Sequence, residues 1–337
     1  MKNSSLKTKI KNKEVTIGSW ITLGHTSIAE IMAKAGFDWL VIDMEHSAIT
    51  LHEAQELIKV IELSGIVPLV RVGNNDSTLI KRVMDAGAHG VIIPMVNCKE
   101  DAVKAVNAVK YPPAGQRGVG LARAQGYGLE FEKYRDWVNK ESIVIVQVEH
   151  IEAVNNLENI LGTQGVDGFI VGPYDLSASL GMPGEFDNPK VEKSLVKIME
   201  ISKDYNVISG FHVVQPNTEE VMEKIKEGYR FIGFSLDTLF LGKTCLSKMG
   251  AKEVPMNKQV CIIPFRREFL IKFNELSQIP LEKAESIDML RALEHGYDVK
   301  MVSTNYKTYS VDTIDDLHRV ENLMGNDSLI KEHKMSI

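Results

Sequence analysis

The stretches IVIVQVEH (143–150) and GFIVGPYDLS (168–177) decide how this chain folds. Each begins with an apolar run that is long enough for a buried strand and short for a helix. An acidic residue follows each run, Glu149 in the first stretch and Asp175 in the second. Near-continuous apolar strands of this kind are typical of a parallel sheet that is covered by helices. The two stretches therefore predict an α/β fold with acids at the ends of buried strands.

The same pattern recurs from residue 15 to about residue 249. The candidate strands are 16–23, 38–44, 67–72, 90–96, 142–149, 167–173, 207–214 and 229–236. Amphipathic stretches separate most of them, and three of these end at Gly36, Gly65 and Gly87, as helix C-termini often do. Eight such units predict a (β/α)8 TIM barrel over residues 1–249. A doubly wound open sheet is the alternative, although no GxGxxG turn follows the first strand.

The regular spacing is interrupted by residues 111–140, which are rich in glycine, proline, arginine and aromatic residues. Long loops in compact domains are usually functional or disordered. We interpret this stretch as part of a site or of a contact between subunits, with Arg117 and Arg123 within reach of a site.

The pattern changes after Met249. Residues 250–258 read as a linker, and residues 259–337 read as a small α+β module with a helix from about 281 to 295 and another that opens at Asp312. This segment is too short for a large independent core, so we expect a C-terminal appendage that packs on something else.

Composition excludes several classes of protein. The chain of 337 residues has a net charge of -6 and no basic stripe, so we expect no nucleic-acid partner. No run approaches the ~20 apolar residues of a membrane span, and the basic, polar N-terminus lacks the apolar core of a secretory signal. Cys98, Cys245 and Cys261 fit neither a disulfide framework nor a zinc motif. These features predict a cytoplasmic protein without membrane contact.

Polar residues accumulate where the predicted strands end. In a TIM barrel the C-terminal ends of the strands carry the chemistry. The polar residues at these positions are Asp43, Glu45, His46, Arg71, Gln147, Glu149, Asp175 and His212. Their accumulation predicts an active site at this rim.

Glu149 and Asp175 are the candidate metal ligands. Two carboxylates close together repel each other, and a divalent ion removes that penalty. Two protein carboxylates leave room for water and substrate, which suits Mg2+ or Mn2+. The alternative is that each is an exposed acid at the start of a helix, where the helix dipole favours it.

Arg71 and His46 are the candidate catalytic residues. An arginine at a strand end can stabilise an oxyanion or bind a carboxylate, and the alternative is a structural ion pair with Asp43 or with a loop acid. His46 follows Asp43 by three residues, and an imidazole held by a carboxylate is a common general base. The alternative for His46 is a loop cap. His212 points either into the barrel or toward the helices, and the sequence leaves both orientations open.

Several motifs, in order, resemble the HpcH/HpaI family of class II pyruvate aldolases over about residues 16–249. They are IDMEHSAIT (42–50), PLVRV (68–72), IPMVN (93–97), YPPAGQRGVG (111–120), VQVEH (146–150) and GPYDLSASLG (172–181). The resemblance implies a (β/α)8 barrel with a divalent metal at Glu149 and Asp175. The ion is Mg2+ or Mn2+, with Co2+ as an alternative. It also implies that Arg71 stabilises an enolate and that a His46–Asp43 dyad transfers protons.

The resemblance further implies a substrate pocket, in which the amide of Tyr174 binds the carboxylate of the substrate. The implied pocket residues are Trp20, Gln147, Gly172, Pro173, Tyr174 and His212. The family usually has a small residue at position 174 and an apolar residue at position 212, so the tyrosine and the histidine bear on substrate preference.

The implied activity is reversible aldol cleavage of a 4-hydroxy-2-oxo acid to pyruvate and an aldehyde by a carbon–carbon lyase that is a homo-oligomer. One alternative is a CoA-thioester lyase of the citrate lyase beta-like barrel group. Another is a non-catalytic scaffold that docks a sugar-nucleotide enzyme. These alternatives differ in whether CoA or metal is bound.

The tail is similar to the C-terminal part of 3-deoxy-manno-octulosonate cytidylyltransferase. The residues that carry the likeness are Glu282, Glu285, Arg291 and Asp312. The nucleotide-binding half of that family is absent, so we expect no cytidylyl transfer and propose a docking or oligomerisation role for the tail. This likeness suggests a 2-keto-3-deoxy sugar acid as the substrate of the barrel.

Overall fold

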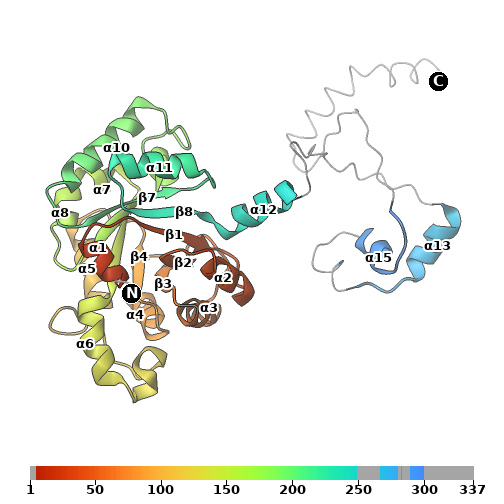
Figure 1. Cartoon of the computed structure of the whole chain (residues 1–337), viewed down its shortest axis with the longest axis horizontal. Helices are drawn as coiled ribbons and strands as arrows, with labels where there is room; N and C mark the ends of the chain where they lie inside the picture. Colours follow the sequence, from red (N-terminus) through yellow and green to blue (C-terminus); the bar gives the residue numbers. More distant parts are fainter. Residues whose placement is uncertain (1–4, 249–265, 280–281, 283–288, 300–337) are drawn as a thin grey trace, which may run out of the picture. The chain divides into compact units, whose positions relative to one another are not determined.

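Eight parallel strands form a closed barrel in the computed structural model (Figure 1). Each strand pairs with the next one along the chain, and β8 pairs with β1 to close the ring. The strands are β1 (Thr16–Ile21), β2 (Trp39–Asp43), β3 (Val67–Arg71), β4 (Gly90–Ile93), β5 (Ile143–Val148), β6 (Gly168–Val171), β7 (Ile208–Val213) and β8 (Phe231–Leu236). The predicted (β/α)8 barrel and its eight strands are confirmed, and the open sheet is excluded.

The structure describes residues 5–248, 266–279, 282 and 289–299. Contacts divide the chain into two compact units, Met1–Ala251 and Lys252–Ile337.

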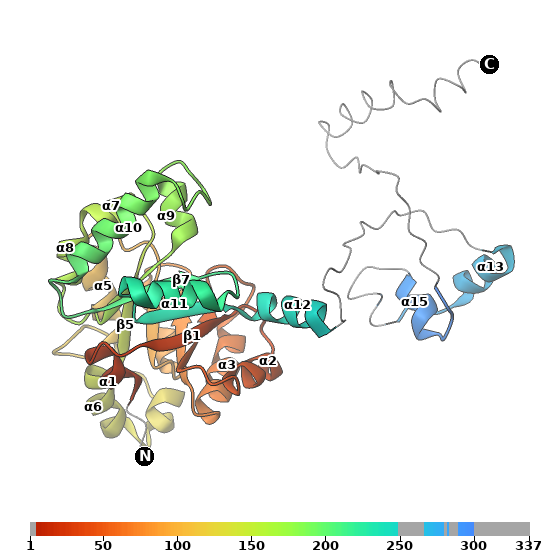
Figure 2. The same cartoon turned by 45° about the horizontal axis from the view of Figure 1, so that its top comes forward.

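Helices are ranged around the outside of the strands (Figures 1 and 2). They are α2 (Thr26–Ala33), α3 (Leu51–Leu63), α4 (Ser77–Asp85), α5 (Lys99–Val109), α6 (Phe131–Glu141), α7 (Ile151–Asn155), α8 (Leu157–Leu161), α9 (Pro173–Ser179), α10 (Pro189–Ser202) and α11 (Thr218–Glu227). Helix α12 (Asp237–Lys248) follows β8 directly and extends away from the strands. Gly36, Gly65 and Gly87 follow α2, α3 and α4 with positive φ, as their positions predicted. In the part of the chain that is described, no helix is long and apolar enough to cross a membrane.

The barrel interior is filled by large side chains placed opposite glycines. The rings of Trp39 and Phe231 stack with centroids 4.1 Å apart. A Cβ atom on Gly18 would lie 2.0 Å from the Trp39 ring, so only glycine fits opposite this tryptophan. Helix α1 (Leu6–Lys11) adds Leu6 and Ile10 to the same inner cluster. The floor of the barrel is therefore a packed core, and the space for chemistry lies toward the C-terminal ends of the strands.

Residues 111–140 are more ordered than a loop. They contain a 3-10 segment, η1 (Arg123–Gly128), and most of α6. Arg117 is buried and pairs with Asp85, and Arg123 pairs with Glu62. Both arginines thus bind partners at the ends of α4 and α3 within their own chain.

The described part of the second unit contains two helices, α13 (Arg267–Glu275) and α15 (Met289–Glu294). Arg291 pairs with Glu282 and lies 4.8 Å from the centroid of the Phe273 ring. Helix α15 falls within the helix predicted from about 281 to 295. The predicted linker 250–258 and the positions Asp312 and Glu285 lie outside the described residues, so the 1–249, 250–258 and 259–337 division stays a prediction.

Candidate active site

The predicted site residues on β1, β2, β3, β5 and β7 reach the rim because they lie on the inner faces of these strands. Side chains of a strand alternate between its two faces. Asp43, Arg71 and Gln147 each lie two residues beyond a member of the inner cluster, and His212 lies four residues beyond Ile208. All four therefore point into the barrel, which settles the orientation that the sequence left open for His212. Trp20 belongs to the inner cluster itself.

Arg71 and Asp43 form a buried, two-pronged ion pair. Nε of Arg71 lies 2.9 Å from Oδ1 of Asp43, and its Nη2 lies 2.7 Å from Oδ2. Burial alone would raise the pKa of Asp43, but the hydrogen bonds and charge of Arg71 outweigh it and leave this pKa below its usual range. Cζ of Arg71 lies 4.4 Å from the centroid of the Trp20 ring. The carboxylate and the indole thus fix the direction of the guanidinium.

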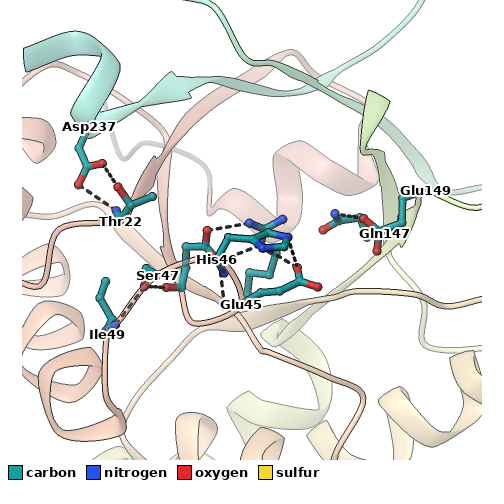
Figure 3. Close-up of polar contacts among 10 residues, drawn as sticks. Thr22, Glu45, His46, Ser47, Ile49, Gln147, Glu149 and Asp237 are labelled. Atoms are coloured by element: carbon teal, nitrogen blue, oxygen red, sulfur yellow. Dashed lines mark hydrogen bonds and ion pairs between the residues drawn. The ribbon is translucent and has the colours of Figure 1, made fainter. Parts of the chain in front are cut away.

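The imidazole of His46 lies beside Glu45 (Figure 3). Its Nε2 is 3.8 Å from Oε2 of Glu45, whereas Asp43 accepts a hydrogen bond from the backbone N–H of His46. Asp43 thus shapes the turn that carries His46, and the acid next to its imidazole is Glu45. The side chain of His46 is 63% exposed, so it faces the mouth of the site.

Glu149 is held from two sides. Its Oε1 accepts a hydrogen bond from the backbone N–H of Met95 at 2.7 Å, and its Oε2 accepts one from Nε2 of Gln147 (Figure 3). Met95 has φ of 51°, an unusual conformation for a residue other than glycine. A Cβ atom on Gly172 would lie 3.1 Å from Oε2 of Glu149, so this glycine gives the carboxylate its space. Backbone strain beside a carboxylate is often found at functional sites.

Asp175 and Tyr174 lie in the first turn of α9, after Gly172 as N-cap and Pro173 as first residue. Both side chains are exposed. Asp175 therefore also fits the alternative interpretation, in which it is an exposed acid at the start of a helix. The ring of Tyr174 packs edge-on against Phe186 with centroids 4.9 Å apart. Tyr174 therefore borders the mouth with its side chain.

The acids fit a divalent cation with an open coordination sphere. Burial and the charges of Glu45 and Asp175 raise the pKa of Glu149 to about 7. Burial, together with Asp43 and Asp175, raises the pKa of Glu45 to about 6. Oε1 of Gln147 is buried and has no hydrogen-bond partner among the described residues. Excess negative charge and oxygen donors suit a hard divalent ion.

Protein ligands alone would not surround such an ion. Within the described ranges, no group of three or more histidine, cysteine, aspartate or glutamate side chains is arranged to hold a metal. Two carboxylates, such as the predicted ligands Glu149 and Asp175, would fill only part of a coordination sphere, and the other positions would be open to water or to a substrate with oxygen ligands.

The chain's relatives share this barrel. A family model for HpcH/HpaI aldolase/citrate lyase matches residues 16–242. The chain belongs to this family. It is 33% identical over 250 residues to a hydroxypyruvate/pyruvate aldolase of Roseobacter denitrificans, covering 73% of this chain and 96% of that protein. It is 35% identical over 239 residues to a 2-keto-3-deoxy-L-rhamnonate aldolase of Escherichia coli, covering 70% and 88%.

Solved structures agree with this assignment. A crystal structure of a member of the HpcH/HpaI family from Burkholderia cenocepacia superposes with a TM-score of 0.69 at 34% identity and covers 73% of this chain and 99% of that one. Another HpcH/HpaI aldolase, from Desulfitobacterium hafniense, gives a TM-score of 0.68 at 31% identity and covers 75% and 99%. The predicted family and the prediction of a carbon–carbon lyase are confirmed. The match of the family model ends at residue 242 and gives no support to the likeness of the tail to a cytidylyltransferase.

The polar residues predicted at the strand ends do lie at the C-terminal ends of the barrel strands, but two of the contacts there could not be predicted from the sequence. Glu45 was among the polar residues at the strand ends, yet its contact with His46 depends on how the turn after β2 folds. Met95 contributes its backbone N–H, and a backbone contact of this kind cannot be predicted from the residue type. The roles of all these residues remain predictions.

Proposed function

We propose that this enzyme cleaves a 4-hydroxy-2-oxo acid reversibly to pyruvate and an aldehyde, with a divalent metal held by Glu149 and Asp175. The single observation that carries the proposal is the juxtaposition of the oriented Arg71 guanidinium with excess carboxylate charge at one barrel rim. A 2-oxo acid needs such a pair of charges, because its cleavage moves electrons onto the oxygen at C2.

Arg71 is assigned to that oxygen. Its guanidinium is already directed by Asp43 and Trp20, so it stabilises the enolate without reorganising during the reaction. Gln147 and Gly172 shape the wall around Glu149. The backbone N–H of Tyr174, in the first turn of α9, is assigned to the carboxylate of the substrate, because N–H groups of a first turn have no helical acceptor.

His46 is assigned to the proton of the C4 hydroxyl. Its position at the exposed mouth places it on the aldehyde side, and the neighbouring Glu45 stabilises the protonated imidazole. Asp43 positions His46 through the backbone. A bound metal ion, which we expect to be Mg2+ or Mn2+ with Co2+ as the alternative, would supply Lewis-acid polarisation of the 2-oxo acid.

The test is pyruvate release from a 4-hydroxy-2-oxo acid. We expect EDTA to abolish it and Mg2+ or Mn2+ to restore it, and Asp175→Asn to weaken the response to metal. Activity that survives EDTA and is trapped by borohydride would indicate a Schiff base and contradict the proposal. The size-matched control is Asp204→Asn, because Asp204 is exposed and precedes β7, at the end of the strands opposite the rim.

Four finer proposals accompany this function. We expect a 2-keto-3-deoxy sugar acid to be cleaved better than a simple 4-hydroxy-2-oxo acid, and a panel of both kinds tests this. We expect a homo-oligomer, because Tyr127 and Leu129, on the surface of residues 111–140, are 71% and 93% exposed. We expect a cytoplasmic location, because the cysteines fit no disulfide framework. We assign residues 259–337 a docking or oligomerisation role, which deletion of this segment and mass measurement would test.

A further inference from the structure

A cleft of about 680 Å³ opens on the outside of the barrel, between α4 and α5. Residues 116–118 form its third side. Its described lining residues include none of the rim residues that we assign to the cleavage reaction. Pockets that hold small molecules in proteins have volumes of about 300–1,000 Å³. The cleft is therefore large enough for a small ligand and is separate from the candidate active site.

Residues 116–118 are fixed to both helices. The backbone N–H of Gln116 donates to the carbonyl of Asn107 on α5 at 2.9 Å. The side chain of Arg117 is fully buried and pairs at 2.5 Å with Asp85, the last residue of α4, so its charge is neutralised away from the cleft. This third side is thus anchored at both helices, and the shape of the cleft is built into the fold.

The cleft carries an excess of positive charge. Lys81 on α4 and Lys99 and Lys104 on α5 line it, and Glu100 is the single acid among its described lining residues. The ion pairs that lysines form in the described part of the chain all involve other lysines. The chain as a whole has a net charge of -6, so this local excess does not follow from its composition.

Hydrogen-bond donors dominate the lining of the cleft. The ammonium groups of its three lysines can only donate, and the hydroxyls of Ser77 and Thr78 can also donate. The first turns of α4 and α5 both border the cleft, and the first N–H groups of a helix have no helical acceptor. The capping acids Asp76 and Asp101 are not among the lining residues. The two helix dipoles add to the positive potential at this end.

The positive charges are spread along the cleft. Lys99 and Lys104 are five residues apart, which corresponds to a rise of about 7.5 Å along α5. Lys81 lies on the other helix. Val103, which lies between the two lysines of α5 in the sequence, is 38% exposed and offers an apolar contact. A ligand with two anionic groups matches this spread, because each group can meet a different ammonium group.

Phosphate is the anionic group that fits this lining. A phosphate group offers more acceptor oxygens and more negative charge than a carboxylate, and lysine binds it as a point charge. Backbone N–H groups at the start of a helix are common phosphate donors. Ammonium groups, hydroxyls and first-turn N–H groups meet in this one cleft.

We propose that the cleft between α4 and α5 binds a small molecule that carries two phosphate groups. Lys81 contacts the ligand from α4, and Lys99 and Lys104 contact it from α5. The inference does not depend on the proposed function, because no residue of the cleft takes part in the cleavage reaction.

The test is calorimetry on the full-length protein with inorganic pyrophosphate, in EDTA and at fixed ionic strength. EDTA is needed because divalent ions bind pyrophosphate themselves. We expect one pyrophosphate per chain, bound at least tenfold more tightly than orthophosphate or malonate. The double variant Lys81→Ala/Lys104→Ala should weaken this binding at least tenfold, as loss of two charged contacts implies. The matched control Lys190→Ala/Lys193→Ala removes the same charge from exposed positions of α10 and should keep the affinity of the wild type.

A variant that should gain affinity guards against effects of misfolding. Glu100→Gln removes the acid from the cleft and should strengthen pyrophosphate binding about threefold, a gain that a folding defect does not produce. An absence of pyrophosphate binding, equal weakening in the two double variants or an unchanged affinity in Glu100→Gln would overturn the inference. Equal affinities for pyrophosphate and orthophosphate would refute a ligand with two phosphate groups, and an equal affinity for malonate would refute the choice of phosphate.

Discussion

Replacing Glu149 with glutamine should remove from the metal-free enzyme the loss of stability that this carboxyl causes as the pH rises from 4.5 to 7. Burial and two neighbouring acids, Glu45 and Asp175, raise the pKa of Glu149 from 4.5 to about 7. The folded state therefore binds a proton between pH 4.5 and pH 7 that the unfolded chain releases. The contribution of this group is fully present below pH 4.5 and is lost as the pH rises toward 7.

The size of the effect follows from the shift. A change of one pKa unit corresponds to about 1.4 kcal/mol, so the shift of Glu149 implies a loss of about 3 kcal/mol across this window. Above pH 7, Glu149→Gln should be more stable than the wild type by an amount approaching that figure. Below pH 4.5 the two proteins should be nearly equal. For a domain of this size, about 3 kcal/mol corresponds to a change in Tm of about 5–10 °C.

The assay is thermal unfolding in EDTA at a series of pH values. Glu152→Gln is the matched control, because its side chain is 67% exposed and it follows Glu149 by three residues. This control should keep the profile of the wild type. Saturating Mg2+ should reverse the order at pH 8, because the ion stabilises the wild type and loses a ligand in Glu149→Gln. Parallel profiles for the wild type and Glu149→Gln would refute the reasoning.

Three further predictions concern other parts of the barrel. Arg71→Lys keeps the positive charge but loses the bidentate ion pair with Asp43, so kcat/KM should fall about 100-fold or more. A loss below tenfold in steady-state kinetics would argue against the role of Arg71 at the C2 oxygen. Gly18→Ala places a Cβ atom 2.0 Å from the Trp39 ring and should cost about 3 kcal/mol in urea unfolding, and an unchanged midpoint would contradict the packing described for the barrel floor. Leu129→Asp places a charge at a position where the side chain is 93% exposed, and it should lower the mass measured by light scattering if residues 111–140 form a contact between subunits. An unchanged mass would exclude Leu129 from that contact.

The fold was predictable because its signal is local. Each buried parallel strand is a short apolar run, and the positions of Gly36, Gly65 and Gly87 marked where helices end. The glycines and prolines of residues 111–140 predict a loop, whereas the structure forms helix α6 at the end of this stretch. Phe131, Tyr134 and Val138 nevertheless have helical spacing and pack inward on one face of it.

The pairing of side chains was less predictable. Asp43 and His46 are three residues apart, which suggested a carboxylate–imidazole contact. The turn after β2 instead directs the backbone N–H of His46 to Asp43 and places the imidazole beside Glu45. Sequence spacing fixes which residues are neighbours, but it does not fix which atoms of a loop residue meet.

The sequence by itself determined the barrel, the rim on which Arg71 and Glu149 lie, and membership of an aldolase family. Apolar strand runs and the order of motifs are properties of consecutive residues, so they can be recognised without the structure. Only the tertiary structure decided the orientation of His212 and the raised pKa of Glu149. Both depend on which strands and loops lie side by side in the closed barrel. Closure brings together residues far apart in the chain, and their distances and mutual charges exist only once the ring has formed.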